Sequence, residues 1–336
     1  MSSVAHVTTA SDVAKLELDP LAIFSFPLDE FQLEAIAALN HGHSVVISAP
    51  TGSGKTLVGE YAIHRAIAHG QKVFYTTPLK ALSNQKLRDF REQFGSQNVG
   101  LMTGDLSVNR EASIVVMTTE IFRNMLYAEA DQADDPLADV EAVVLDECHY
   151  MNDSQRGTVW EESIIHCPAS VQLVALSATV ANAGQLTDWI ERVHGPTQLV
   201  FSDYRTVPLQ FSFCSAKGLH PLLNDAGTGL HPNSKVWRAP KGHKRKGRSP
   251  KPPQPEPPPI RFVIAQMAER EMLPAIYFIF SRRGCDKSVK DLGSQCLVSP
   301  TQQEQIRQRL RTYSETNPEA VRDGIHADAL LRGIAA

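Results

Sequence analysis

The clearest chemical signal in this sequence is a glycine-rich turn that ends in a lysine and a threonine, Ala49-Pro50-Thr51-Gly52-Ser53-Gly54-Lys55-Thr56. Gly52 and Gly54 let the backbone curl, so that successive N–H groups point inward at phosphate oxygens. Lys55 is then placed to reach the β- and γ-phosphates, and the hydroxyl of Thr56 can bind Mg²⁺. A plain glycine-serine turn before an ordinary helix is the competing interpretation, and the lysine and threonine in this register argue against it. The turn therefore predicts a site for a nucleoside triphosphate.

Two adjacent carboxylates form a second chemical centre, because Asp146 and Glu147 directly follow the apolar run Val143-Val144-Leu145. In enzymes with such a turn, an aspartate at a strand end holds the Mg²⁺ that Thr56 would also bind, which assigns Asp146. Glu147 is then placed to orient or deprotonate the attacking water. Taken alone, such a pair is also common at the start of a solvated loop. Its position several strand–helix units after the glycine-rich turn favours the catalytic interpretation.

His149 and the stretch Ser177-Ala178-Thr179 are candidates for coupling this centre to the rest of the protein. The place of His149 beside Glu147 favours a link between the nucleotide and the next strand end over a surface histidine. Ser177 and Thr179 follow the apolar run 171–176, where their hydroxyls could bridge the carboxylate pair to a neighbouring domain. The tripeptide Ser-Ala-Thr often occurs by chance. It supports this interpretation only because it follows the glycine-rich turn and the carboxylate pair in the chain.

Gln32 is the candidate for recognising the base of ATP. An amide side chain can donate and accept together, which suits the edge of an adenine. Asp29 is placed to cap the helix that carries Gln32, and either Phe24 or Phe26 could stack on the base. A surface glutamine on a helix is the plainer interpretation, and the position shortly before the glycine-rich turn keeps both interpretations open.

These residues need a scaffold, and short apolar runs alternate with amphipathic segments around them. The expected buried strands are 44–48, 72–77, 99–103, 114–117, 143–145 and 171–176. Such alternation predicts an α/β fold with a mostly parallel sheet and helices on both faces. Ligands of such sheets bind outside the carboxyl ends of the strands. The loops at Pro78, Gly104 and Thr118 follow strand ends, so we expect them to share one rim with the glycine-rich turn.

The bulk composition is that of an ordinary soluble globular protein, with 336 residues, 42% hydrophobic and 21% charged. The net charge of −4 confines any nucleic-acid-binding surface to a local patch. The five cysteines include no CxxC pair, which indicates a reducing compartment and neither a disulfide framework nor a zinc site. Without a membrane span or a signal-peptide core, we expect a cytoplasmic protein with no membrane partner and a solvated arm at 1–20.

Taken together, the glycine-rich turn, Asp146-Glu147-Cys148-His149 and Ser177-Ala178-Thr179 resemble the first three signature motifs of a superfamily 2 DExH-box helicase. Further loops resemble the superkiller-type helicases, which feed RNA to the exosome in eukaryotes and have bacterial and plastid relatives. These loops are Pro78-Leu79-Lys80-Ala81-Leu82-Ser83-Asn84-Gln85-Lys86, Thr103-Gly104-Asp105 with Asn109, and Met117-Thr118-Thr119-Glu120-Ile121 with Met125-Leu126-Tyr127. The resemblance runs from about Phe24 to Pro208 and implies a first RecA-like domain of the P-loop NTPase type, expected at 21–215.

The resemblance also implies roles that spacing alone does not show. It places six residues along a nucleic-acid backbone, namely Pro78, Lys80, Gly104, Asp105, Thr118 and Thr119. It implies no catalytic thiol, because Cys148 occupies a variable position of the family motif. The implied partner is single-stranded nucleic acid, with RNA favoured by the stretches 84–86 and 118–121, together with RNA-degradation machinery.

Beyond Lys235 the composition changes to a basic run, Lys241 to Lys251, and then to a proline-rich stretch, Pro250 to Pro259. We expect an extended linker or surface insertion over 216–259. A flexible cationic arm of this kind could add nonspecific affinity for phosphates.

The last part of the sequence resembles the opening of a second RecA-like domain. The run Pro274 to Ser281 predicts a buried strand, followed by Arg282-Arg283-Gly284-Cys285-Asp286. The resemblance implies that 260–336 is an incomplete second domain. It also implies that Arg282 and Arg283 lie too early in that domain to complete an ATPase site.

The expected function is that of an ATP-dependent RNA helicase, present here mainly as its nucleotide-binding half and with little turnover alone. A DNA helicase of the same superfamily is one alternative. A nonenzymatic ATP-binding fragment or adaptor is another. Backbone contacts carry no base information, so no sequence preference is predicted.

Overall fold

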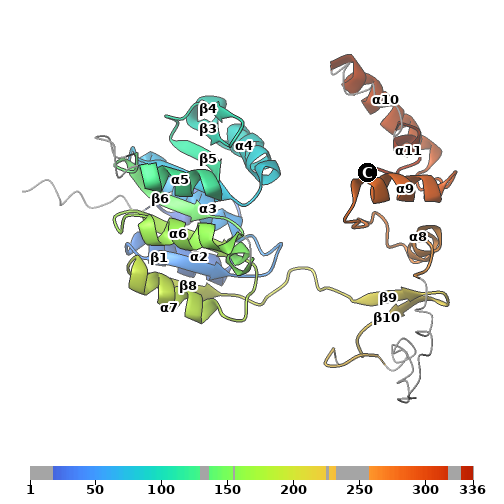
Figure 1. Ribbon diagram of the computed structural model, residues 1–336, viewed down its shortest axis with the longest axis horizontal. Coiled ribbons are helices and arrows are strands. Elements are labelled where there is room, and N and C mark those ends of the chain that lie inside the picture. The colour runs from blue at the N-terminus through green and yellow to red at the C-terminus, as the bar shows by residue number, and fades with distance from the viewer. Residues whose placement is uncertain are drawn as a thin grey trace, which may run out of the picture. The chain divides into compact units, whose positions relative to one another are not determined.

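The structure is a computed structural model that describes residues 18–128, 136–153, 156–224, 227–231, 257–316 and 327–335. The chain divides into two compact units, Met1–Pro208 and Leu209–Ala336. The division lies close to residue 215, where the first domain is expected to end. Figure 1 shows helices around a sheet in the first unit, and helices with one hairpin in the second.

Within the described residues of the first unit, eight strands form one sheet in the order β4-β3-β5-β2-β6-β7-β1-β8. Neighbouring strands pair in parallel, except that β4 runs antiparallel to β3. The predicted mostly parallel sheet is therefore confirmed, and β4 and β8 are added at its two edges. The strands are β1 Ser44–Ser48, β2 Lys72–Thr77, β3 Val99–Met102, β4 Ser107–Val108, β5 Ile114–Thr118, β6 Val140–Leu145, β7 Gln172–Ser177 and β8 Thr197–Phe201.

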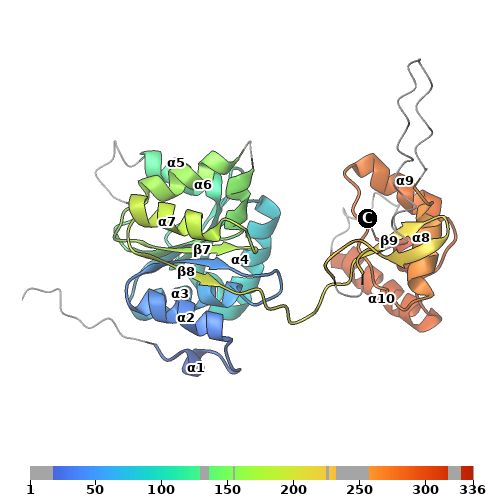
Figure 2. The same cartoon turned by 90° about the horizontal axis from the view of Figure 1, so that it is seen from below.

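Helices cover both faces of this sheet, as Figure 2 shows with α2 and α3 below it and α5, α6 and α7 above it. Side chains of α2, α3 and α4 pack in one apolar core, and those of α5, α6 and α7 pack in a second. The helices are α1 Pro20–Ile23, α2 Glu30–Asn40, α3 Thr56–Ala68, α4 Lys80–Phe94, α5 Thr119–Ala128, α6 Gly157–His166 and α7 Ala183–Val193, with 3₁₀ turns η1 Ser96–Asn98 and η3 Cys148–Asn152. The predicted helices on both faces are therefore confirmed.

The central strands are apolar throughout because successive side chains point to opposite faces and both faces are buried. In β1, Val45 and Ile47 join the core under α2 and α3, whereas Val46 joins the core under α6 and α7. All three are at most 1% exposed. Each such side chain stabilises the fold by about 1.5–3 kcal/mol. This double burial holds the strand ends, and the loops that follow them, in fixed positions.

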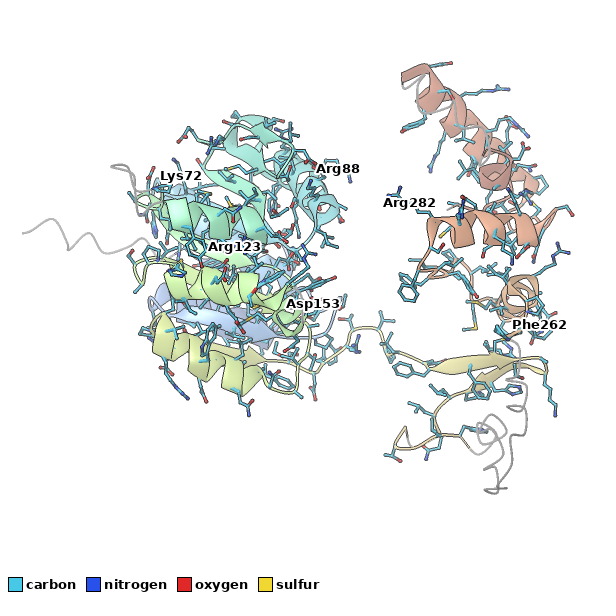
Figure 3. All side chains as sticks on the ribbon, viewed as in Figure 1. Lys72, Arg88, Arg123, Asp153, Phe262 and Arg282 are labelled. Carbon is cyan, nitrogen blue, oxygen red and sulfur yellow. The ribbon has the colours of Figure 1, made fainter. Side chains whose placement is uncertain are left out.

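In the second unit, the described residues form an antiparallel hairpin and four helices around a small core. The hairpin consists of β9 Ser212–Ser215 and β10 Gly218–Pro221. The helices are α8 Ile260–Ala268, α9 Arg282–Leu292, α10 Pro300–Thr316 and α11 Ala327–Leu331. The core contains Ile264, Val289, Leu292, Ala329 and Ile334. Arg282 is the first residue of α9 and is exposed, as is Arg283 (Figure 3).

The predicted buried strand at Pro274 to Ser281 is wrong. Among the residues that the structure describes, this segment has no strand partner, and the side chains of Ile276, Phe278 and Phe280 are 82%, 80% and 105% exposed. A strand requires backbone hydrogen bonds to a neighbouring strand, and the described strands of this unit, β9 and β10, pair with each other. The apolar run alone therefore does not make a strand.

The predicted basic run lies outside the described residues, as does most of the proline-rich stretch. In the described part of the chain, no helix combines the length and the apolar character needed to cross a membrane.

Candidate active site

The glycine-rich turn connects the carboxyl end of β1 to the first residue of α3. Gly52 and Gly54 have φ values of +84° and +81°, in the left-handed region that side chains rarely adopt. Space around Gly52 is open, so only its backbone conformation requires glycine there. At Gly54 a Cβ would also come 2.8 Å from Nε2 of Gln32. The sequence therefore folds locally into the curled turn expected of a phosphate cradle.

Two polar side chains of the turn, Lys55 and Ser53, lack a partner among the described residues, and the hydroxyl of Ser53 is also fully buried. Lys55 is 8% exposed, and none of the ion pairs among the described residues involves it. The hydroxyl of Ser53 is also buried and has no hydrogen-bond partner. A buried hydroxyl is costly without a hydrogen-bond partner, and a cation without an ion pair attracts an anion. Phosphate oxygens would satisfy both groups, so these residues fit the triphosphate of ATP.

The predicted carboxylates lie directly after β6. Oδ1 of Asp146 accepts a hydrogen bond of 2.9 Å from the N–H of Glu147, and Oδ2 accepts one of 2.9 Å from the hydroxyl of Tyr75. Glu147 adopts left-handed backbone angles of φ +53° and ψ +42°. Such a conformation in a residue with a Cβ is typical of functional sites. One carboxylate and one hydroxyl, Asp146 and Thr56, fit Mg²⁺, which proteins usually hold by one or two carboxylates together with substrate phosphates.

His149 lies between Glu147 and the stretch 177–179. Its Nδ1 is 3.3 Å from Oε2 of Glu147 and 3.3 Å from the backbone nitrogen of Ala178. A protonated Nδ1 donates to Glu147, whereas an unprotonated Nδ1 accepts from Ala178. Nδ1 can therefore form a hydrogen bond with Glu147 or with Ala178, but not with both at once. The structure therefore places His149 beside the strand end at 177–179, the contact expected from the sequence.

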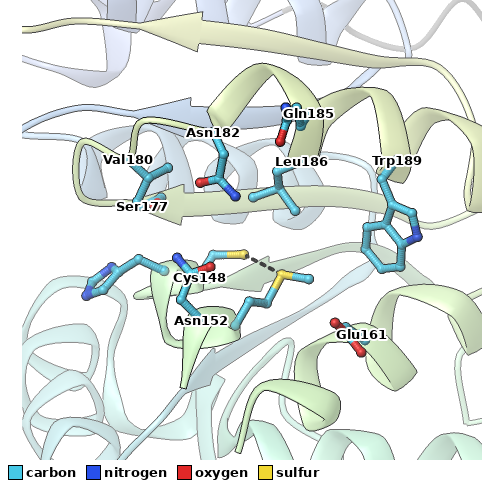
Figure 4. A pocket seen from close by; sticks show the side chains of 11 residues that line it. Cys148, Asn152, Glu161, Ser177, Val180, Asn182, Gln185, Leu186 and Trp189 are labelled. Atoms are coloured by element: carbon cyan, nitrogen blue, oxygen red, sulfur yellow. Dashed lines mark hydrogen bonds between the residues drawn. The ribbon is translucent and has the colours of Figure 1, made fainter. Parts of the chain in front are cut away.

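The stretch 177–179 also touches the glycine-rich turn. The carbonyl oxygen of Ser177 accepts a hydrogen bond of 3.2 Å from the N–H of Ala49. The hydroxyl of Ser177 donates to the carbonyl of Ala178 at 2.9 Å, and Thr179 is exposed. Figure 4 shows the pocket beside this stretch, about 250 Å³ in volume, with Cys148 and Ser177 on its walls and Trp189 at one end.

Cys148, which follows Glu147, is fully buried in the apolar core under α5, α6 and α7. Burial raises the pKa of its thiol to about 12. The thiol therefore stays protonated at neutral pH, and its Sγ lies 3.8 Å from the sulfur of Met151. Cys148 packs as a small apolar side chain rather than as a nucleophile.

Gln32 contacts the turn itself. Its Oε1 accepts a hydrogen bond of 2.8 Å from the N–H of Asp29, and its Nε2 donates one of 3.0 Å to the carbonyl of Gly54. Of the two candidate stacking rings, Phe24 is 7% exposed and Phe26 is 52% exposed. A contact from Gln32 to adenine stays a prediction, and Phe26 is the more accessible ring.

Four of the six predicted nucleic-acid contacts line one depression of about 430 Å³, which we call the loop rim: Pro78, Lys80, Gly104 and Thr118. Lys80 forms an exposed ion pair with the fifth residue, Asp105. The sixth, Thr119, is fully buried and donates its hydroxyl to the carbonyl of Thr77 at 3.3 Å. Thr119 therefore offers only its backbone, at the start of α5, where unpaired N–H groups favour phosphate.

Sequence reasoning missed Arg156, which lines the same rim. Its guanidinium donates to the carbonyl of Pro78 at 2.9 Å and pairs with the carboxylate of Glu120. The side chain thus fastens the loop after β2 to the start of α5. Pro78 is 78 positions away in the sequence, and no local pattern signals that contact.

The sequence pattern of the DEAD/DEAH box helicase family matches residues 29–186, which span the glycine-rich turn, the carboxylates and the stretch 177–179. These residues form a DEAD/DEAH box helicase domain. The predicted resemblance is therefore confirmed. In this helicase domain, β1, β6 and β7 deliver the three signature motifs to one edge of the sheet.

Curated relatives of the helicase domain include RNA helicases of the DExH type. The chain is 42% identical to the DExH-box ATP-dependent RNA helicase DExH15, chloroplastic, of Arabidopsis thaliana, over 96% of this chain and 31% of that protein. It is 42% identical to the human Exosome RNA helicase MTR4 over 78% of this chain and 25% of that protein. It is 41% identical to the Probable helicase HelY of Mycobacterium tuberculosis over 95% of this chain and 37% of that protein. The chain thus spans about a third of the length of these relatives.

Among solved structures, the chain is similar to the Mycobacterium smegmatis helicase Lhr bound to ssDNA and AMP-PNP. The two are 28% identical with a TM-score of 0.42, over 54% of this chain and 26% of that chain.

Proposed function

We propose that this chain binds ATP with Mg²⁺ at the glycine-rich turn and forms the nucleotide-binding part of an ATP-dependent RNA helicase. The observation that supports this most directly is that the turn holds a lysine without an ion pair, Lys55, beside a buried hydroxyl without a hydrogen-bond partner, Ser53. The family pattern over 29–186 and the RNA helicases among the relatives support the same assignment.

In the proposed reaction, Lys55 and the N–H groups of the turn bind phosphate oxygens, and the start of α3 adds its positive dipole end. Thr56 and Asp146 hold Mg²⁺, which when bound neutralises charge on the phosphates. Glu147 orients the attacking water and accepts its proton. The carboxylate suits this task because its side chain is 32% exposed, open enough for water to reach it.

His149 couples the nucleotide to the strand end at Ala178 in this proposal. Its Nδ1 is shared by Glu147 and Ala178. A proton on Nδ1 favours the bond to Glu147, and loss of that proton favours the bond to Ala178. Whether Nδ1 carries a hydrogen thereby determines which partner His149 bonds to, the carboxylate of Glu147 or the backbone N–H of Ala178.

Single-stranded nucleic acid binds along the loop rim in this proposal. Lys80 supplies a charge, and the N-terminus of α5 supplies backbone N–H groups for phosphates. The choice of RNA rests on the relatives, among which are RNA helicases of Arabidopsis thaliana and human. We extend the proposal to RNA-degradation machinery as a partner, because one relative is named an exosome RNA helicase.

The nucleotide assignment is tested with Lys55→Ala and a fluorescent ATP analogue in the presence of Mg²⁺. Loss of a charge-assisted contact of about 3 kcal/mol should weaken binding about 100-fold. Lys72→Ala is the matched control, because Lys72 lies at the amino end of β2 and pairs with Glu111 and Asp139. Equal affinities in the two variants would contradict the proposed site.

The RNA assignment is tested by fluorescence anisotropy with RNA and DNA single strands of the same base sequence. RNA should bind more tightly, and affinity for both should fall as salt rises. Lys80→Ala should weaken both without affecting binding of the ATP analogue. Tighter binding of DNA would favour a DNA helicase on the same fold.

A further inference from the structure

The hydroxyl of Tyr75 touches the carboxylate that holds Mg²⁺ in the proposed function. Tyr75 lies on β2, is 0% exposed, and donates a hydrogen bond of 2.9 Å to Oδ2 of Asp146. The other oxygen, Oδ1, accepts from the N–H of Glu147 at 2.9 Å. A carboxylate offers about four lone-pair sites, so about two remain for a metal ion or its water ligands. Both oxygens are thus oriented before any metal binds.

The donor, Tyr75, lies on β2, and the acceptor, Asp146, directly follows the neighbouring strand β6. The register of these two strands is fixed. β2 pairs in parallel with β6, with Tyr75 opposite Val144 and Thr76 opposite Leu145. The N–H of Asp146 continues this pairing by donating to the carbonyl of Thr76 at 3.0 Å. Tyr75 and Asp146 therefore keep their separation whatever the surface loops do.

The ring of Tyr75 is held by two helices that belong to different parts of the site. Phe90 of α4 meets it edge-on at 5.0 Å between centroids, and Nζ of Lys86 lies 5.3 Å from the ring centroid. On the other side, Gly59 of α3 packs so closely that a Cβ there would come 3.3 Å from the ring. Because α3 begins at the glycine-rich turn and α4 begins at Lys80, the ring is fixed by elements from both the nucleotide site and the loop rim.

The chemistry of the hydroxyl suits an obligatory donor. Burial raises the pKa of Tyr75 well above its ordinary value, and the charge of Asp146 raises it further. The hydroxyl therefore keeps its proton at any working pH. As a donor it fixes the direction of Oδ2 of Asp146.

We propose that Tyr75 is a positioning residue for the Mg²⁺-binding carboxylate of Asp146, an inference that rests on the proposed function. Without the hydroxyl, Oδ2 of Asp146 loses its donor and the carboxylate can turn away from the orientation that the metal requires. Partners behind a metal ligand typically change metal affinity 10- to 100-fold. We expect the lower end, about tenfold, because Glu147 still holds Oδ1.

The test uses the full chain, a fluorescent ATP analogue and a Mg²⁺ titration at fixed nucleotide concentration. Tyr75→Phe should bind the nucleotide in EDTA with wild-type affinity, which also shows that it is folded. Its Mg²⁺ midpoint should rise about tenfold. Tyr61→Phe is the matched control, because Tyr61 is equally buried and its hydroxyl bonds to Asn40 and the carbonyl of Leu18 instead. That control should keep the wild-type midpoint.

A second arm repeats Tyr75→Phe in an Asp146→Asn background, where the effect on the Mg²⁺ midpoint should disappear because the carboxylate is gone. A wild-type midpoint in Tyr75→Phe, or an equal shift in Tyr61→Phe, would overturn the role of Tyr75 and leave the proposed function standing. A wild-type chain that binds the nucleotide equally with and without Mg²⁺ would overturn both.

Discussion

Glu147, the proposed catalytic carboxylate, has a strained backbone with φ at +53°. A left-handed conformation costs a residue with a Cβ roughly 1–2 kcal/mol, and glycine avoids this cost but loses roughly 0.5–1 kcal/mol in chain entropy. The strain persists because the position places a carboxylate beside Asp146 and His149. Stability therefore favours glycine at position 147, whereas the proposed chemistry requires a carboxylate there.

We expect Glu147→Gly to melt about 1–4 °C above Glu147→Gln, because glycine relieves the strain and glutamine retains it. Both variants should bind the ATP analogue within about twofold of wild type, since Lys55 and the turn are untouched. Both should lose whatever phosphate release the wild-type chain shows. Thermal denaturation and nucleotide titration measure the two effects. A glycine variant less stable than the glutamine variant would contradict the strain argument.

The buried Cys148 leads to a prediction about thiol reactivity. Its pKa of about 12 and its burial keep it a protonated thiol, whereas Cys296 is exposed. A thiol-alkylating reagent at pH 7.5 should therefore modify Cys296 at least about 100-fold faster, and Cys148 only after denaturation. Mass spectrometry of the native and the urea-treated chain gives the two rates. Comparable native rates would show that η3, which carries Cys148, opens readily.

At the scale of elements, the segment from η3 to α6 joins the two halves of the site. It begins beside Glu147 and ends at Arg156, whose guanidinium holds Pro78 and Glu120. Among its described residues, Gly157 packs so close to Met151 that a Cβ there would come 2.2 Å from the carbonyl oxygen of Met151.

Arg156→Ala should weaken binding of single-stranded RNA about fivefold to tenfold, because the loop after β2 is released from α5 and loses its preorganised position. Binding of the ATP analogue should stay within about twofold of wild type. Arg123→Ala is the matched control, because Arg123 also joins α5 to α6 through Glu162 but does not touch Pro78. Anisotropy with labelled RNA measures the difference. Equal losses in both variants would mean that α5 packing, not the contact to Pro78, sets the affinity.

The sequence predicts those elements whose signal is local. Apolar runs mark β1, β2 and β5 because both faces of these strands are buried, and the glycine-rich turn is recognisable because its chemistry lies within eight consecutive positions. The run at 274–281 has the same appearance and forms no strand, because pairing depends on a neighbour that a local pattern does not contain. Tyr75 escapes prediction for a related reason, since its partner Asp146 is 71 positions away.

At the scale of the whole molecule, the two units have separate cores of very different size. The first unit is built on two large cores that cover both faces of the sheet, whereas the described core of the second contains five buried residues. Small cores give small net stability. The units should therefore differ in how they respond to denaturant and to nucleotide.

Urea denaturation should show two transitions, with the second unit unfolding at the lower concentration. ATP analogue with Mg²⁺ at about 100 times its dissociation constant should stabilise the first unit by about 2.7 kcal/mol and leave the other transition in place. Tryptophan fluorescence follows the first unit through Trp160, which is fully buried there. A single transition that shifts as a whole with nucleotide would contradict the independence of the two cores.

The ion pair of Lys80 and Asp105 gives the loop rim a counterion of its own. When an unpaired lysine binds a phosphate of a nucleic acid, a dissolved anion leaves the lysine or a cation leaves the phosphate. This release of ions makes the binding affinity depend on ionic strength. A phosphate that binds Lys80 must displace the carboxylate of Asp105. Because Asp105 belongs to the same chain, its carboxylate stays nearby and repels the phosphate. Lys80 therefore adds less to the affinity, and less to its salt dependence, than a free lysine would. If single-stranded nucleic acid binds the loop rim as proposed, it should therefore dissociate more readily than from a rim with an unpaired lysine.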